Sequence, residues 1–246
     1  MLPLAKGRLT ARFATTPHDL NRALALRHQC FIADRGLVTP ITDHDSFDDR
    51  CQHILIEDLG SGTLVCCFRL MKFVSGVFLS TSYSAQFYDL TRLIHYPEPM
   101  AELGRFCIHP DFTDPDILRI AWGALARMVD GLNVHMLFGC TSFDGANPAL
   151  HDAAFAFLHG PHLAPDRWKV GVKSPDAYLF PKASGADPAR AMALMPPLLR
   201  TYLAMGGWVS DHAVIDAKLN TTHVFTALEI SAIPPRRARL LRELAS

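Results

Sequence analysis

The feature that most constrains this chain is a short apolar segment, residues 101–108, that carries two opposite charges. Its sequence, Ala-Glu-Leu-Gly-Arg-Phe-Cys-Ile, predicts a buried strand in which Gly104 lies between Glu102 and Arg105. An unpaired charge in a protein core costs on the order of several kcal/mol, so each charge needs a partner. Residues three apart on a regular strand point to opposite faces, but a β-bulge at the glycine would bring both side chains to one side. We expect either an acid–base or substrate-binding pair on a bulged central strand, or a structural ion pair near the strand end.

Size and composition indicate a globular protein with a substantial core. The chain has 246 residues, 49% of them hydrophobic and 20% charged, which suits one domain over residues 1–246. It has no apolar run of about 18 residues and no signal-like start, so a cytoplasmic location is expected. The six cysteines form no Cys-x-x-Cys pair and are expected to be reduced core thiols. The net charge of zero gives no indication of nucleic-acid binding.

The order of predicted elements indicates an α/β protein with a mixed sheet and helices on both of its faces. Strands are predicted over residues 8–14, 53–58, 64–73, 101–108, 133–141, 177–181, 208–215 and 224–230. Helices are predicted over residues 17–31, 116–130, 148–159 and 196–205, with an amphipathic helix in the basic tail from about 234 to 246. Irregular structure is predicted for residues 33–50, for the aromatic segment 76–98 and for the proline-rich region 160–190.

Charges outside the central strand could supply its partners. Arg69 is a lone arginine in an apolar predicted strand and requires a carboxylate, which Asp45, Asp48 or Glu102 could provide. Asp45 and Asp48 could hold a cationic substrate amine, or could simply lie in a solvated acidic loop. Arg27, on the first predicted helix, is either a surface residue or part of the same network.

Motifs for metal binding and covalent catalysis are missing from the sequence. The twelve histidines include no His-x-x-x-His or His-Glu-x-x-His, so no metal site is predicted. The serine-hydrolase motif Gly-x-Ser-x-Gly is also absent. Ser142, at the end of a predicted strand, could donate a hydrogen bond to an acyl carbonyl or could cap the following turn.

The turn after the central strand argues against a nucleotide-bearing acyl donor. Coenzyme A is usually held by a glycine-rich, basic turn at a helix N-terminus, where free N–H groups bind the pyrophosphate. Here residues 109–116 read His-Pro-Asp-Phe-Thr-Asp-Pro-Asp, with no glycine and no Lys or Arg. Such a turn would repel a pyrophosphate, so any thioester donor is expected to lack the nucleotide.

Short motifs between residues 20 and 230 resemble a known family. They are Arg27-x-x-x-Phe31, Asp45-Ser-Phe-Asp48, His53, Phe68-Arg69-Leu70, Glu102-Leu-Gly-Arg105, His109-Pro-Asp, Gly139-Cys-Thr-Ser-Phe143, Pro196-Pro-Leu-Leu-x-x-Tyr-Leu and Val214-Ile-Asp-x-x-Leu-Asn-Thr-Thr222. The chain resembles the ornithine N-acyltransferases of bacterial ornithine-lipid synthesis. These lie in the GNAT-like superfamily, which also contains the acyl-homoserine-lactone synthases.

The resemblance implies a GNAT-like acyl-CoA N-acyltransferase fold in which two central parallel strands splay apart at a bulge. The pantetheine arm of the donor would lie in that opening and pair with backbone near Phe106 and Ile108. The implied donor is an acyl carrier protein, which brings its own 4′-phosphopantetheine, so no separate cofactor is expected.

The implied reaction moves a 3-hydroxyacyl chain to the α-amine of L-ornithine and gives lyso-ornithine lipid. The catalytic residues inferred from it are Glu102 as base, Arg105, and Ser142 as an oxyanion donor beside backbone N–H groups. The substrate-binding residues inferred from it are Arg27, Phe31, Asp45, Asp48 and Arg69. Arg69 or Arg105 would bind the ornithine carboxylate, and Asp45 or Asp48 its side-chain ammonium.

Further surfaces are assigned by the same reasoning. The segment 78–96 and the helix at 149–159 would line the acyl tunnel. Basic residues would dock the acidic carrier protein, namely Arg119, Arg127, Arg167, Lys169 and the tail arginines. The tail also suits an anionic membrane, which would make the protein peripheral on the inner membrane, or it is a frayed terminus. Two rival functions stay open: an acyl-homoserine-lactone synthase that uses S-adenosylmethionine, and a non-enzymatic lipid-binding protein of the membrane surface.

Overall fold

The computed structural model describes residues 3–37, 42–182 and 187–245. They form two compact units, the first from the described parts of residues 1–72, 103–134 and 235–246 and the second from the described parts of residues 73–102 and 135–234. Strand β6 (Met100–Ile108) begins in the second unit and ends in the first. The organisation into one domain, expected from the sequence, stays a prediction.

The strands of the first unit follow the order β1-β2-β3-β4-β6. Before β6 they are β1 (Leu4–Lys6), β2 (Leu9–Phe13), β3 (Gln52–Asp58) and β4 (Leu64–Phe73), and the first four pair antiparallel. Strand β4 is buried along nearly its whole length because it is apolar on both faces. Arg69 and Lys72 are the exceptions in its sequence; Lys72 is exposed, whereas Arg69 is buried.

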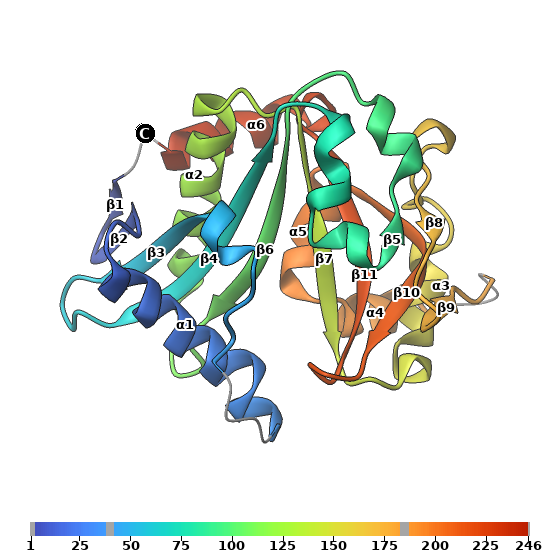
Figure 1. Cartoon of the computed structure of the whole chain (residues 1–246). Helices are drawn as coiled ribbons and strands as arrows, with labels where there is room; N and C mark the ends of the chain where they lie inside the picture. Colours follow the sequence, from blue (N-terminus) through green and yellow to red (C-terminus); the bar gives the residue numbers. More distant parts are fainter. Residues whose placement is uncertain (1–2, 38–41, 183–186, 246) are drawn as a thin grey trace. The chain divides into compact units, whose positions relative to one another are not determined.

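Three helices accompany these strands: α1 (Pro17–Phe31), α2 (Pro115–Gly131) and α6 (Pro235–Ala245). Helix α1 begins as predicted after Thr16, whose hydroxyl accepts the Asp19 N–H while Asp19 caps the Thr16 backbone. Figure 1 shows α1 in front of the strands of this unit and α2 behind them. Helix α6 packs closely on α2, because a Cβ at Gly123 would lie 2.7 Å from the Leu244 carbonyl oxygen. The amphipathic tail helix expected from the sequence is confirmed.

The strands of the second unit follow the order β6-β7-β11-β10-β9. After β6 these are β7 (Met136–Asp144), β11 (Thr221–Glu229), β10 (Trp208–Asp216) and β9 (Ala177–Leu179). Strand β6 runs parallel to β7, from the Met100–Met136 pair to the Glu102–Phe138 pair, whereas the other pairs are antiparallel. This unit is therefore a mixed sheet, as predicted. The splay of β6 from β7 beyond these pairs stays a prediction.

One face of the second unit's sheet is covered by short helices and the other by 3-10 turns. The helices are α3 (Asp152–Leu158), α4 (Pro188–Leu194) and α5 (Pro197–Ala204), packed on an apolar core that includes Phe143, Phe155 and Val224. The other face carries η3 (Gly76–Thr81), η4 (Ser84–Gln86), β5 (Tyr88–Asp89) and η5 (Thr91–His95), and β5 pairs with β8 (Gly171–Val172). Figure 1 shows this segment in front of the strands of its unit. The aromatic irregular segment is confirmed.

Two boundaries differ from the prediction. Strand β7 begins at Met136 rather than near residue 133, because Asn133 has a φ of 51° and so belongs to the turn that ends α2. The predicted helix at 148–159 opens with a 3-10 turn, η6 (Pro148–His151), and becomes α-helical at Asp152. No helix among the described residues combines the length and the apolarity that crossing a bilayer would require.

Candidate active site

The first unit holds a balanced group of charges, which we call the arginine–aspartate cluster. Its members are Arg27, Arg69, Arg105, Asp43, Asp45 and Asp48. The arginines come from α1, β4 and β6, and the aspartates come from the loop that leads into β3. Three separate elements thus hold one loop by ion pairs.

Arg27 is fully enclosed in this cluster. Only 1% of its surface is exposed, and its Nε lies 2.6 Å from Asp43 Oδ2 while its Nη1 lies 2.7 Å from Asp48 Oδ1. It also donates to the Asp43 backbone carbonyl. Of the two alternatives for this residue, the surface role is wrong and membership of the network is confirmed.

Arg69 and Arg105 complete the cluster from the strands. Arg69 binds Asp45 with both Nη atoms, at 2.6 and 2.9 Å, and its Nη1 lies 2.5 Å from Asp48 Oδ1. Arg105 donates to Asp43 at 3.0 Å and to Asp45 at 3.1 Å. The expected carboxylate partners of Arg69 are confirmed. Asp43 was not among the predicted site residues, although its position beside Asp45 in an acidic loop was a usable signal.

The electrostatics of the cluster favour the ionised forms of Asp45 and Asp48. Burial raises the pKa of Asp48, but Arg27, the Asp45 N–H and Arg69 together outweigh burial and leave the pKa below its ordinary value. The pKa of Asp45 is lowered in the same way, with Arg69 as the main opposing cause. Burial lowers the pKa of His53, whose Nε2 lies 3.0 Å from the Asp48 carbonyl, so this neighbour is neutral at pH 7. With three arginines and three aspartates, the formal charges of the cluster balance.

The backbone of β6 is irregular at Arg105. Its φ is 53°, in the left-handed region, which costs a non-glycine residue on the order of 1–3 kcal/mol. The β-bulge that the sequence predicts at Gly104 stays a prediction; Gly104 itself is not among the positive-φ glycines. A Cβ at Gly104 would lie 3.5 Å from Arg69 Nε, an ordinary contact. The strained residue is thus the one whose side chain the aspartates hold.

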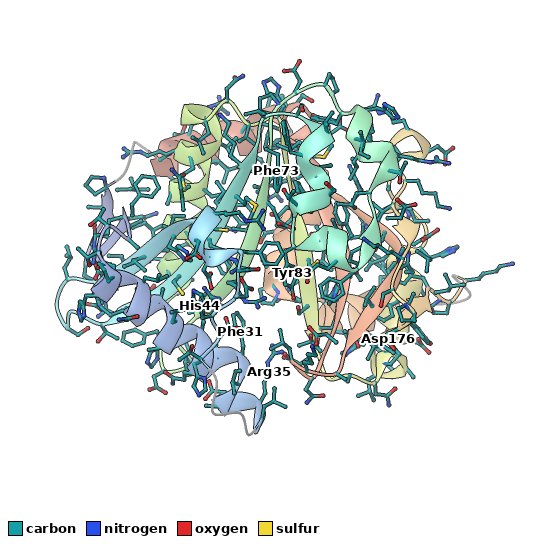
Figure 2. All side chains as sticks on the ribbon, viewed as in Figure 1. Phe31, Arg35, His44, Phe73, Tyr83 and Asp176 are labelled. Carbon is teal, nitrogen blue, oxygen red and sulfur yellow. The ribbon has the colours of Figure 1, made fainter. Side chains whose placement is uncertain are left out.

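Glu102 lies in the part of β6 that belongs to the second unit. The residue is 5% exposed, and its carboxylate accepts hydrogen bonds from Tyr83 N at 2.9 Å, Ser84 N at 2.7 Å and Ser84 Oγ at 2.6 Å. Figure 2 labels Tyr83 in the segment that covers this sheet face. Glu102 accepts hydrogen bonds from the segment of residues 76–95, and Arg105 donates to loop aspartates.

The sheet face under the covering segment is lined with polar groups. Because side chains alternate along a strand, Phe138, Cys140 and Ser142 of β7 share the face of Glu102, which pairs with Phe138. Cys140 Sγ lies 3.5 Å from Ser84 Oγ, and Ser142 is exposed. Helix α3 packs on the opposite face through Phe155. Of the two elements expected to line an acyl tunnel, the covering segment thus lies on Glu102's face and the helix does not.

The remaining predicted residues lie in the first unit. Phe31 is partly buried and packs on the core between α1 and the strands. The ring of Phe106 stacks on Phe68 at 5.7 Å, and the Ile108 carbonyl accepts from Cys30 Sγ at 3.4 Å. No group of His, Cys, Asp or Glu in the described parts of the chain is arranged to hold a metal ion.

The turn at 109–116 leads into α2, and a carboxylate of the turn occupies the helix N-terminus, where a phosphate group could otherwise bind. Asp114 caps the helix, and its Oδ1 accepts the N–H of Asp116 at 2.9 Å. The Asp114 carboxylate therefore occupies the N-terminus of α2, and Asp116 places a second carboxylate beside it.

Comparison with known proteins relates the whole chain to acyltransferases. Residues 26–123 match the family model of an acetyltransferase (GNAT) domain. The chain is 32% identical over 247 residues to an L-ornithine N(alpha)-acyltransferase of Brucella abortus, covering 94% of this chain and 87% of the relative. It is 29% identical over 235 residues to the protein of that name from Rhodobacter capsulatus, covering 90% of each. The structure of FeeM, an N-acyl amino acid synthase from uncultured soil microbes, shares the fold, with a TM-score of 0.53, 10% identity and 94% coverage of each chain.

Proposed function

The chain belongs to the family of L-ornithine N(alpha)-acyltransferases, and on this premise we propose that it moves an acyl chain from a thioester donor to the α-amine of L-ornithine. The family and the GNAT-like acyltransferase fold expected from the sequence are confirmed. The proposal is carried by the 32% identity to the Brucella abortus relative over 94% of this chain.

The donor we propose is a 3-hydroxyacyl chain on an acyl carrier protein. The turn at 109–116 supports this choice, because Asp114 caps the helix where the pyrophosphate of coenzyme A would otherwise bind. The phosphopantetheine arm then belongs to the donor and pairs with backbone near Phe106 and Ile108. The enzyme needs no resident cofactor for the transfer.

The proposed chemistry is direct aminolysis of the thioester. The ornithine α-ammonium gives a proton to Glu102, or to a water that Glu102 holds, and the free amine attacks the thioester carbonyl. The tetrahedral intermediate collapses, the amide forms, and the thiolate of the pantetheine leaves and takes up a proton. Three donors hold Glu102 in place, which supports its role as an ordered carboxylate. Ser142 and backbone N–H groups of β6 would stabilise the oxyanion.

Burial supports a choice among the candidate ornithine ligands. The side chains of Asp48 and Arg69 are 0% and 4% exposed, whereas those of Asp45 and Arg105 are 23% and 14% exposed. We therefore assign the substrate ammonium to Asp45 and the substrate carboxylate to Arg105. Asp48, Arg69 and Arg27 act as positioning residues that hold the loop in place.

A product assay tests the function. The full chain is incubated with 3-hydroxyacyl carrier protein and L-ornithine, and the product is identified by mass spectrometry. Parallel reactions contain 3-hydroxyacyl-coenzyme A as donor or S-adenosylmethionine as acceptor. We expect Nα-acyl-ornithine, formed faster from the carrier-protein donor than from coenzyme A. An acyl-lactone from S-adenosylmethionine, or no acyl product at all, would contradict the proposal.

A further inference from the structure

A buried histidine on the face of Glu102 has one ring nitrogen without a partner. His223 of β11 is 2% exposed, and its Nε2 has no hydrogen-bond partner among the residues that the structure describes. Its ring is enclosed by the covering segment, with the Phe87 ring at 4.9 Å and the Tyr88 ring at 5.6 Å. Buried polar groups without partners are uncommon in native proteins, so such a nitrogen calls for a reason.

Tyr88 determines which nitrogen of His223 carries the proton. Its Oη lies 2.8 Å from the His223 carbonyl oxygen and 3.0 Å from His223 Nδ1. A carbonyl can only accept, so the single hydroxyl proton goes to it, and Nδ1 must then donate its own proton to Oη. A neutral imidazole has one N–H group, so Nε2 presents a bare lone pair. Burial lowers the pKa of His223 to about 4, which keeps the ring neutral at pH 7.

The surroundings of this lone pair define the ligand that would satisfy it. The lining is aromatic: Phe87 and Tyr88 contact His223, and Phe225 follows it on the same face of β11. An apolar body with one neutral donor fits such a lining, whereas an ammonium ion would lose its hydration among these rings. A hydroxyl group on an aliphatic chain has this chemistry.

The lone pair lies on the sheet face that carries the proposed chemistry, at the register of an exposed residue. His223 pairs with Ser142 across the β7–β11 ladder, so their side chains share a face, and Ser142 is exposed. Two residues earlier on β7, Cys140 approaches Ser84, which binds Glu102. A chain bound along this face could therefore pass from Glu102 to His223.

Resting on the proposed acyl transfer, we propose that Nε2 of His223 accepts a hydrogen bond from a hydroxyl on the acyl chain and thereby selects hydroxylated over unsubstituted chains. Tyr88 is the positioning residue that fixes the tautomer. A site built to bind a hydroxyl rejects the chain that lacks it, because the buried acceptor is then left unpaired. This is a specificity role and leaves the proton transfer to Glu102.

The experiment compares two carrier-protein donors of equal chain length, with and without a 3-hydroxyl, by kcat/KM at saturating ornithine. We expect the protein to prefer the hydroxylated donor by about 10- to 100-fold. His223→Phe should reduce this ratio to about 3-fold or less, mainly by slowing the hydroxylated donor. His223→Gln, which restores an acceptor oxygen, should keep part of the preference, and thermal melts establish that each variant is folded.

Variants of two other buried histidines serve as controls for the effect of His223 on the donor preference. His151 is also buried and has an unpartnered Nδ1, but it packs on Phe143 and Phe155 on the opposite face, so His151→Phe should leave the ratio unchanged. His212 shares the face of His223 and has an unpartnered Nε2. A ratio that collapses in His212→Phe but not in His223→Phe would overturn the assignment.

A binding measurement separates this inference from the proposed function. Nitrogen-15 NMR of the full chain monitors Nε2 of His223 while 3-hydroxyacyl-pantetheine or acyl-pantetheine is added without ornithine. We expect only the hydroxylated ligand to shift this resonance. If the shift occurs but no acyl-ornithine ever forms, the subsite stands and the proposed function fails. If acyl-ornithine forms equally well from both donors, the function stands and the subsite is wrong.

Discussion

The carboxylate of Glu102 has both a structural role and a proposed chemical role. Its three hydrogen bonds fix residues 83 and 84 of the covering segment, and the proposed transfer needs its charge. Glu102→Gln removes the base but keeps one acceptor oxygen for Ser84. We expect kcat to fall at least about 100-fold, with a smaller loss of stability of about 1–3 kcal/mol from the unsatisfied Tyr83 N–H.

Steady-state kinetics and thermal melts separate these two effects. Glu57→Gln is the matched control, because this carboxylate is also paired, with Arg12 and Arg22, but lies in the first unit on β3. It should leave kcat unchanged. Near-normal turnover of Glu102→Gln would remove Glu102 from the chemistry and leave it the structural role alone.

At the scale of elements, the arginine–aspartate cluster joins α1, β4 and β6 through one loop, and Asp48 is its most buried carboxylate. Its pKa is lower in the folded chain than in the unfolded chain, where it is about 3.9. The cluster's stabilisation is therefore fully present above the unfolded pKa and is lost as pH falls through the folded pKa. We expect Asp48→Asn to destabilise the protein by about 3–5 kcal/mol at pH 7, because Arg27 and Arg69 lose a shared counter-charge.

Urea denaturation at pH 7 and pH 3 measures both parts of this prediction. The variant should lose less stability than the natural chain between the two pH values, since the titrating group is gone. Asp116→Asn is the control: its pair with Arg119 is equally short at 2.6 Å but exposed, so it should change stability little. Equal pH dependence in the Asp48 variant and the natural chain would contradict the role given to Asp48.

The same elements show which parts of the fold and the site the sequence could predict. Helix α1 was predictable because its cap, Thr16 with Asp19, lies within one turn, and the partners of Arg69 followed from the cost of burying a lone charge. The contact of Tyr88 with His223 was not, because it joins residues 135 positions apart and leaves no local pattern. The left-handed φ of Arg105 was also missed, since strain at a non-glycine residue depends on the ion pairs that hold it.

At the scale of the whole molecule, α6 is the surface best suited to an acidic partner. Other basic residues expected to dock the carrier protein are engaged elsewhere: Arg127 binds the Ala245 and Pro3 carbonyls, and Arg167 pairs with Glu229 at 3.2 Å. On α6, four exposed positions are arginine, at residues 236, 237, 239 and 242, of which Arg242 pairs with Asp130 at 3.3 Å. Its leucines at 241 and 244 are half-buried, and Leu240 is 49% exposed. A helix that enters a membrane would present its whole apolar side outward, whereas two of these three leucines face inward, which favours an acidic protein as the partner.

Charge reversal at Arg236, Arg237 and Arg239 tests this assignment. We expect the triple change to glutamate to raise KM for the acylated carrier protein about 10-fold at low salt, with KM for ornithine unchanged. The difference from the natural chain should shrink as salt increases, because the charges are exposed. Lys218→Glu, in the exposed turn between β10 and β11, controls for a general change of charge. If the triple variant keeps its KM for carrier protein but no longer sediments with anionic vesicles, α6 contacts the membrane instead.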